Sequence, residues 1–144
     1  MNMDALQAYH QADISRASFA DPHQLIVMLM DGALDRIAKA KGSLLQNQHS
    51  EKGKHISHTI TIISGLSECL DMDTGGDLSS NLADLYDYMN RQLLQANLKN
   101  DAKFLDEVSS LLNEIKGAWI AIPLPVREEY DKQSNQQVAE VMAD

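Results

Sequence analysis

Apolar residues recur along this chain at intervals of three and four positions rather than two. This spacing places them on one face of an α-helix, so the pattern predicts helices throughout and no β-strands. Proline, which interrupts helices, is absent from the hundred residues that separate Pro22 from Pro123. The hydrophobic pattern therefore predicts an all-α protein.

Four apolar stripes, separated by polar or glycine-containing breaks, predict four long helices. The first is expected to begin after Asp21, with Pro22 as its first helical residue, and to run to about Gln48. Breaks at 46–54, 71–76 and 97–100 precede the second, third and fourth helices, and the fourth ends at Pro123. The predicted core positions are Ile26, Leu29 or Met30, Ala33, Ile37, Ala40 and Leu44; Ile56, Ile60, Ile63, Leu66 and Leu70; Leu78, Leu82, Leu85, Met89 and Leu93; and Leu105, Val108, Leu112, Ile115 and Trp119.

Helices of this length are about 30 Å long, and short connections force consecutive helices to be antiparallel. We expect an antiparallel up-down-up-down four-helix bundle over residues 21–123. Residues 1–20 are partly apolar and form a separate N-terminal segment. Residues 124–144 form a polar C-terminal tail with at most a short helix.

Charge and cysteine content narrow the function classes. The 144 residues include 12 Lys and Arg against 21 Asp and Glu, a net charge of -9, which disfavours nucleic acid and anionic lipid as partners. The longest apolar run, residues 25–30, is far shorter than the roughly twenty residues of a membrane span. The single cysteine excludes an internal disulfide, and we see no secretion signal. We expect a cytoplasmic protein.

No residue pattern points to catalysis, a metal or a cofactor. A di-metal bundle needs a Glu-x-x-His pair from each of two helices, and the chain has no such pair. His55 and His58 could share a helix face, which is a weak metal signal. Residues 71–77 resemble a calcium loop but lack the ligands at its fifth and twelfth positions, so we expect a turn there. Cys69 has no histidine nearby in sequence and is expected to be a buried, inert thiol.

The first two helices carry more apolar or uncharged surface than a bundle core requires. Residues 25–30 surround the helix axis, whereas a core stripe covers only about 100°. Part of this run must therefore face something else, and the flexible side chains of Met28 and Met30 suit a varied partner surface.

The second helix has no charged residue between His55 and Ser67. Its outer positions are expected to offer Ser57, Thr61 and Gly65, with Ile62 as an additional apolar residue. Small and hydroxylated side chains let another backbone approach closely, which favours a groove for a partner helix or extended peptide. The alternatives are chance, and coverage of this face by the N-terminal segment or by a second copy of the chain.

An ordered set of motifs resembles the FliS family of flagellar export chaperones. The motifs are Asp21-Pro22-x-x-Leu25-Ile26-x-Met28-Leu29-Met30-Asp31-Gly32-Ala33, Gly75-Gly76-Asp77-Leu78, Asn81-Leu82-x-x-Leu85-Tyr86-x-Tyr88-Met89, Gln95-Ala96-Asn97, and Leu105-x-Glu107-Val108 with Trp119. No single motif is diagnostic, but together they cover most of the chain.

This resemblance implies a cytoplasmic four-helix-bundle chaperone that binds the C-terminal segment of flagellin. Such a protein prevents premature polymerisation and delivers flagellin to the flagellar type III export apparatus, whose gate component would be a second partner. The resemblance implies no cofactor and no enzymatic activity. It also implies that the flagellin segment wraps around the bundle in apolar grooves, and that residues 1–20 cap part of this surface when flagellin is absent.

The surface argument and the resemblance together predict a set of partner-binding residues. Tyr9 would be the capping tyrosine of the N-terminal segment. Met30 departs from the family pattern, which commonly has an aromatic residue there, and Asp21 departs where small residues are common. Leu66 and Tyr86 fit core positions equally well. The full set is Tyr9, Met28, Met30, Asp31, Thr61, Ile62, Gly65, Leu66, Asn81, Tyr86, Arg91 and Asn97.

Substitutions on the second helix test this interpretation. Ile62→Asp or Thr61→Lys should weaken flagellin binding and leave the helical circular dichroism unchanged. The rival from another class is a homo-oligomeric helical-bundle interaction protein with a different partner, in which the uncharged face packs against a second copy as a homodimer.

Overall fold

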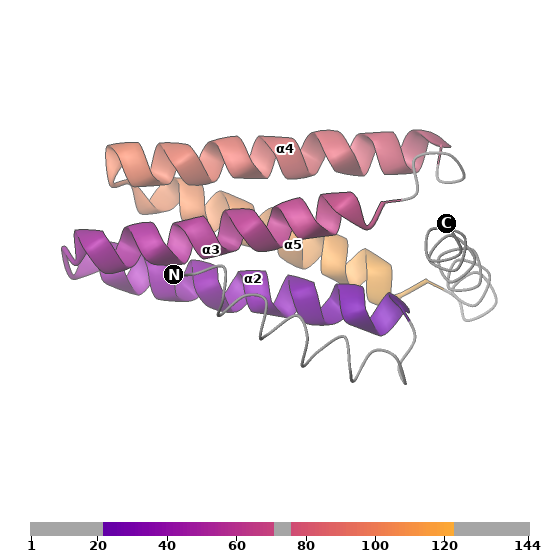
Figure 1. Cartoon of the computed structure of the whole chain (residues 1–144), viewed down its shortest axis with the longest axis horizontal. Helices are drawn as coiled ribbons and strands as arrows, with labels where there is room; N and C mark the ends of the chain where they lie inside the picture. Colours follow the sequence, from indigo (N-terminus) through magenta and orange to yellow (C-terminus); the bar gives the residue numbers. More distant parts are fainter. Residues whose placement is uncertain (1–21, 71–75, 123–144) are drawn as a thin grey trace, which may run out of the picture. The chain divides into compact units, whose positions relative to one another are not determined.

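A computed structural model describes residues 22–70 and 76–122. These residues form four helices: α2 (Pro22–Leu45), α3 (His49–Glu68), α4 (Gly76–Lys99) and α5 (Ala102–Ile120) (Figure 1). They contain no strand, which confirms the predicted all-α four-helix fold for the described ranges. The up-down-up-down order stays a prediction. Tyr9, Asp21, the N-terminal capping segment, residues 71–75 of the predicted turn at 71–77 and the C-terminal tail lie outside the described residues.

The helix boundaries differ from the predicted ones at the first connection. Helix α2 begins at Pro22 as predicted but ends at Leu45, and Asn47 has a φ of 58°, the left-handed conformation that stops a helix. The predicted break at 46–54 is wrong, because only residues 46–48 connect α2 to α3. Polar residues can extend a helix without contributing an apolar stripe, so composition overstated the length of this break. Helix α4 similarly continues to Lys99, and Asn100 has a φ of 49°.

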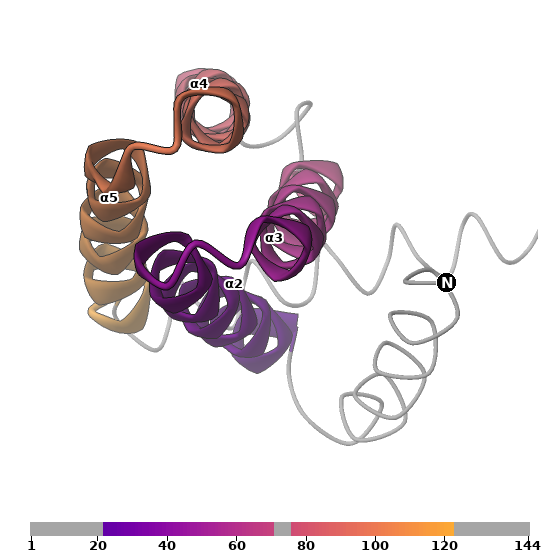
Figure 2. The ribbon, with the colours of Figure 1, turned by 90° about the vertical axis from the view of Figure 1, so that its left-hand side faces the viewer.

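The chain divides into two compact units, and the larger one comprises Leu29–Lys116. It holds most of each of the four helices, which lie around a shared core (Figure 2). Every helix contributes one buried stripe, as the hydrophobic pattern predicts, but the predicted core residues Leu44, Ile60, Leu70 and Ile115 are only half-buried. Among the most buried apolar side chains of this unit are Met30, Ala33, Ile37 and Ala40 from α2; Ile56, Ile63 and Leu66 from α3; Met89, Leu93 and Ala96 from α4; and Leu105, Val108 and Leu112 from α5. Each large side chain in this core contributes about 1.5–3 kcal/mol by leaving water.

The predicted stripe of the third helix is wrong at its start. Leu78 is 67% exposed, and Leu82 and Leu85 are only half-buried. The stripe of α4 instead passes through Ser79 and Tyr86 before it reaches Met89. The buried face at the start of α4 is therefore rotated by about one residue from the predicted face.

Polar contacts connect neighbouring helices of this unit. The Lys52 ammonium on α3 donates to the Asn97 carbonyl of α4 at 3.0 Å and to the Asn100 side-chain oxygen. Further along the same pair of helices, Asn90 Nδ2 donates to Ser64 Oγ at 3.3 Å. The start of α3 thus meets the end of α4, and its second half meets the middle of α4, the order expected of an antiparallel pair.

The smaller unit includes residues 22–28 and 117–122 of the described chain. Here the rings of His23 and Trp119 stack with centroids 4.9 Å apart and planes 14° from parallel. His23 Nε2 donates to the Trp119 carbonyl at 2.9 Å, and Trp119 Nε1 donates to the His23 carbonyl at 3.1 Å. Two reciprocal hydrogen bonds and one stacked pair therefore join the start of α2 to the end of α5.

Candidate partner-binding surface

Helix α3 has a buried face and an uncharged outer face. Its buried residues include Ile56, Thr59, Ile63 and Leu66. On the opposite side, Ser57 and Thr61 are exposed, and three neighbours are half-buried. We define the α3 outer face as Ser57, His58, Thr61, Ser64 and Gly65, positions that share one side of a helix because they are three or four residues apart.

The α3 outer face is lined by groups that admit another backbone. A Cβ placed on Gly65 meets no atom within 4 Å, so the space beside this residue is open. The Thr61 hydroxyl donates to the Ser57 carbonyl at 3.0 Å, and Ser64 Oγ accepts from Asn90 at 3.3 Å. The donor of Thr61 is thus engaged within α3, but its oxygen keeps acceptor capacity for a partner N–H group.

Ile62 does not lie on this outer face, contrary to the sequence interpretation. It is 4% exposed and belongs to the buried stripe, because it follows Thr59 by three residues and precedes Leu66 by four. Ile62→Asp would therefore place a carboxylate in the interior. We therefore now expect Ile62→Asp to disturb the helical fold, contrary to the expectation from the sequence. Thr61→Lys, by contrast, places its charge at an exposed position.

The other predicted binding residues separate by burial. Met30, Leu66 and Tyr86 are 1%, 2% and 3% exposed, which matches the core alternative noted for the latter two. The exposed members are Asp31, Asn81, Arg91 and Asn97, while Met28 is half-buried. Contact of any of these residues with a partner stays a prediction.

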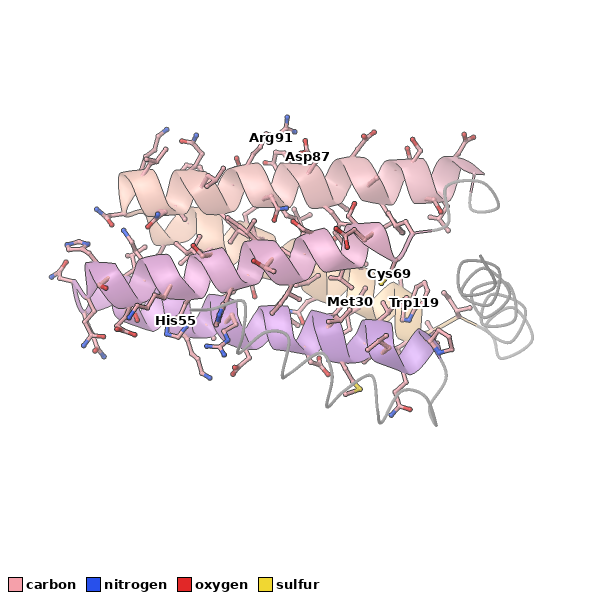
Figure 3. The ribbon with its side chains drawn as sticks, viewed as in Figure 1. Met30, His55, Cys69, Asp87, Arg91 and Trp119 are labelled. Carbon is pink, nitrogen blue, oxygen red and sulfur yellow. The ribbon has the colours of Figure 1, made fainter. Side chains whose placement is uncertain are left out.

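Two exposed members already have intramolecular partners. Arg91 lies 3.6 Å from Asp87, one turn earlier on the outer side of α4 (Figure 3). Asp31 on α2 forms an ion pair with Lys116 on α5. The structure thus brings Thr61 and Gly65 together on the α3 outer face but leaves Asp31 and Arg91 on other helices.

A cluster of nitrogen-bearing side chains escaped the sequence interpretation. Arg36 Nη1 on α2 lies 3.4 Å from His55 Nδ1 on α3, and His58 lies one turn further along α3. Burial lowers the pKa of His55 and of His58, and the positive charge of Arg36 lowers both further. The predicted break at 46–54 hid this cluster, because only the observed connection at 46–48 places Arg36 beside His55.

Other chemistry is sparse in the described ranges. No helix among the described residues is long and apolar enough to cross a membrane. The same residues contain no group of three His, Cys, Asp or Glu side chains that could hold a metal ion. Cys69 is exposed at the end of α3, so the expected buried thiol is wrong. Its position beyond the last turn of α3 explains this, since the apolar stripe that buries Leu66 does not extend to Cys69.

The fold and its surface define an all-α helical bundle whose outer helix faces are the candidate sites. Residues 3–125 match the family model described as flagellar protein FliS, and the chain belongs to this family. The resemblance inferred from the sequence motifs is therefore confirmed.

Several relatives support this assignment. The chain is 47% identical over 121 residues to the flagellar secretion chaperone FliSB of Pseudomonas aeruginosa, a match that covers 83% of this chain and 96% of the relative. It is 42% identical over 120 residues to the flagellar secretion chaperone FliS of Vibrio cholerae, covering 83% and 88%. It is 47% identical over 116 residues to the protein of the same name from Salmonella typhimurium, covering 79% and 86%. The family is thus a chaperone family and not an enzyme family.

Proposed function

We propose that this chain is a cytoplasmic chaperone that binds the C-terminal segment of flagellin and keeps it from polymerising prematurely. It then delivers flagellin to the flagellar type III export apparatus, where a gate component receives the complex. The names of its relatives, flagellar secretion chaperones, support the class of this role. The proposed binding site rests on one observation: the α3 outer face is uncharged and is open beside Gly65.

A wrapped flagellin segment fits the physical requirements of such binding. A segment that becomes ordered on binding loses conformational entropy and needs a large contact surface to offset it. The α3 outer face supplies close backbone approach, and α4 supplies apolar area through Leu94 and Leu98, which are 51% and 76% exposed. These two leucines are four residues apart and so share one side of α4. Several shallow contacts on different helices are therefore expected to add up to stable binding.

Thr61→Lys tests the position of the site. The substitution adds a charged side chain to the α3 outer face, and covering that charge with a partner carries a desolvation cost. We expect the dissociation constant for a C-terminal flagellin segment to rise by about tenfold or more, which corresponds to about 1.4 kcal/mol. Isothermal titration calorimetry measures this change.

Ser110→Lys provides the matched control, because it adds the same charge at an exposed serine of α5. It should bind like the wild type, and both variants should keep the wild-type circular dichroism and melting temperature. Wild-type affinity in the Thr61→Lys variant would move the flagellin site away from the α3 outer face.

The homo-oligomeric alternative predicts a different outcome. Light scattering across a dilution series, with and without the flagellin segment, separates the two functions. A chaperone forms a heterocomplex of defined mass, whereas the alternative gives a homodimer that flagellin leaves unchanged and that Thr61→Lys dissociates. Flagellin export in cells that carry only the Thr61→Lys variant tests delivery, and we expect export to fall.

A further inference from the structure

We propose that Arg36, His55 and His58 form a receptor for a carboxylate of the bound flagellin segment. This inference rests on the proposed function and adds a polar anchor to it. Arg36 comes from α2 and the two histidines come from α3, all within the unit Leu29–Lys116. Figure 3 shows His55 on the side of α3 that meets α2, in agreement with its contact with Arg36.

The guanidinium of Arg36 lacks an anionic partner among the described residues. Its contact among these residues is the long hydrogen bond of 3.4 Å to His55 Nδ1. Because a guanidinium only donates, Nδ1 accepts and carries no proton. The nearby carboxylates are engaged elsewhere, Asp35 with Lys39 at 2.9 Å and Glu51 with Lys54 at 3.6 Å. Arginine presents its N–H groups in a fork that matches a carboxylate, so most of its donor capacity is available to one.

His58 connects this cluster to the α3 outer face. Its Nε2 atom is buried and has no hydrogen-bond partner among the described residues. Such buried, unsatisfied polar atoms are uncommon in folded proteins and call for an explanation. His58 precedes Thr61 by three residues, so a peptide that lies along Thr61 and Gly65 also passes this ring. Because Nε2 is covered, the imidazole has to rotate toward that peptide, and a carboxylate would then give Nε2 the partner it lacks.

The charges around the cluster favour an anion. His55 faces Arg36, Lys39 and Asp35 from α2 and Glu51 from its own helix, while His58 faces Arg36 and His55. Burial lowers the pKa of both rings, and Arg36 is the largest charge effect on each, so protonation is disfavoured in the free protein. A bound carboxylate reverses this effect, because it pairs with the guanidinium and stabilises protonated imidazole. Binding is therefore expected to take up protons and to tighten as the pH falls from 7.5 to 6.0.

Calorimetric titration of the full-length chain with a C-terminal flagellin segment tests the site at these two pH values. Repeating it in two buffers of different ionisation enthalpy gives the number of protons taken up. For Arg36→Gln we expect the dissociation constant at pH 7.5 to rise about tenfold, as for loss of a charge-assisted hydrogen bond. For the double variant His55→Gln, His58→Gln we expect proton uptake to fall to near zero. Lys103→Gln removes the same charge from an exposed position on α5 and should stay within about twofold of the wild type.

Two changes to the flagellin segment identify the source of the carboxylate. One amidates the C-terminus, and the other replaces acidic side chains by their amides. The change that removes the bound carboxylate should weaken binding to the wild type by the same factor as Arg36→Gln and have no further effect on that variant. Because these changes leave the chaperone intact, they also decide the matter if Arg36→Gln proves unstable in a thermal melt.

The outcomes separate the two proposals. A wild-type chain that does not bind the flagellin segment overturns both the proposed function and the carboxylate site. Binding that is unaffected by Arg36→Gln and by both peptide changes, with no proton uptake, overturns the carboxylate site and leaves the chaperone function standing. Weaker binding in Arg36→Gln that matches the effect of one peptide change supports both.

Discussion

Helices α3 and α4 contact each other and each contributes a buried stripe, but their outer faces differ. The outer side of α4 carries Asp84, Asp87 and Arg91, with an ion pair between the last two (Figure 3). The α3 outer face has no charged side chain over residues 55–67. Packing specifies only the inner stripe of each helix, and charge is the usual way to keep the rest in water. The core therefore does not explain why α3 lacks charge, and the proposed flagellin site would account for it.

The two helices also expose different kinds of uncharged surface. All the exposed large apolar residues of this pair lie on α4, at Leu78, Leu94 and Leu98, within the described ranges. Helix α3 exposes small and hydroxylated residues instead. Leucine side chains offer apolar contact area, whereas Gly65 offers close approach of a backbone. The difference suggests that a bound segment would contact the two helices in different ways.

The largest effect is expected when a charge is placed on the inner side of α3 rather than on its outer side. Ile62→Asp puts a carboxylate where the side chain is 4% exposed, and we expect it to lower the free energy of unfolding by about 4 kcal/mol or more. Thr61→Lys, one residue earlier and exposed, should change it by less than about 0.5 kcal/mol. Urea unfolding followed by circular dichroism measures both. Equal effects of the two substitutions would contradict the assignment of inner and outer faces.

The link between α3 and α4 should show the next largest effect. Lys52 is 3% exposed, and its ammonium donates to two acceptors at the end of α4. Lys52→Met keeps most of the apolar stem but removes these hydrogen bonds, and we expect a loss of about 1–2 kcal/mol. Lys54→Met is the matched control, because Lys54 is exposed and, among the described residues, pairs only with Glu51 of its own helix at 3.6 Å. A loss in the control equal to that in Lys52→Met would show that the contact with α4 contributes nothing.

The fold was predictable from the sequence because helical periodicity is a local signal. The stripes of the first and fourth helices identified Ala33, Ile37, Leu105 and Leu112 correctly as core residues. The prediction failed where one face could not be told from another. Leu78 is apolar but lies in the exposed first turn of α4.

The candidate site was only partly predictable, because it depends on contacts between helices. The charge gap in α3 could be read directly, but the burial of Ile62 follows from the rotation of α3 about its axis. Lys52 lies in a polar stretch that favoured a loop, and its burial depends on acceptors 45 and 48 residues away in sequence. The contact between Arg36 and His55 likewise requires the connection at 46–48 to be known.

Glycine substitutions on two helices should change stability less and test whether a partner backbone approaches α3 closely. Gly65 in α3 and Gly42 in α2 both have open space where a Cβ would lie. Alanine is the better helix former, so Gly65→Ala and Gly42→Ala should each raise the free energy of unfolding by up to about 1 kcal/mol. Only Gly65→Ala should weaken binding of the flagellin segment, because its methyl group occupies the space for the partner backbone. Equal affinities of the two variants would argue against close approach at Gly65.

The smallest expected effect is a loss of stability at low pH, which we attribute to two histidines of α3. The pKa of His55 and that of His58 lie below the ordinary value of 6.5 in the folded chain. The unfolded chain therefore binds more protons as the pH falls below about 6.5, so stability is fully present above that pH and declines toward the lower folded values. Urea unfolding of the wild type at pH 7.5 and 5.5 should show this decline, and the double variant His55→Gln, His58→Gln should show a smaller one. The same decline in both proteins would mean that the two histidines do not account for it. A decline that is reduced by the double variant and also by bound flagellin segment would show that one pair of histidines responds to both folding and binding.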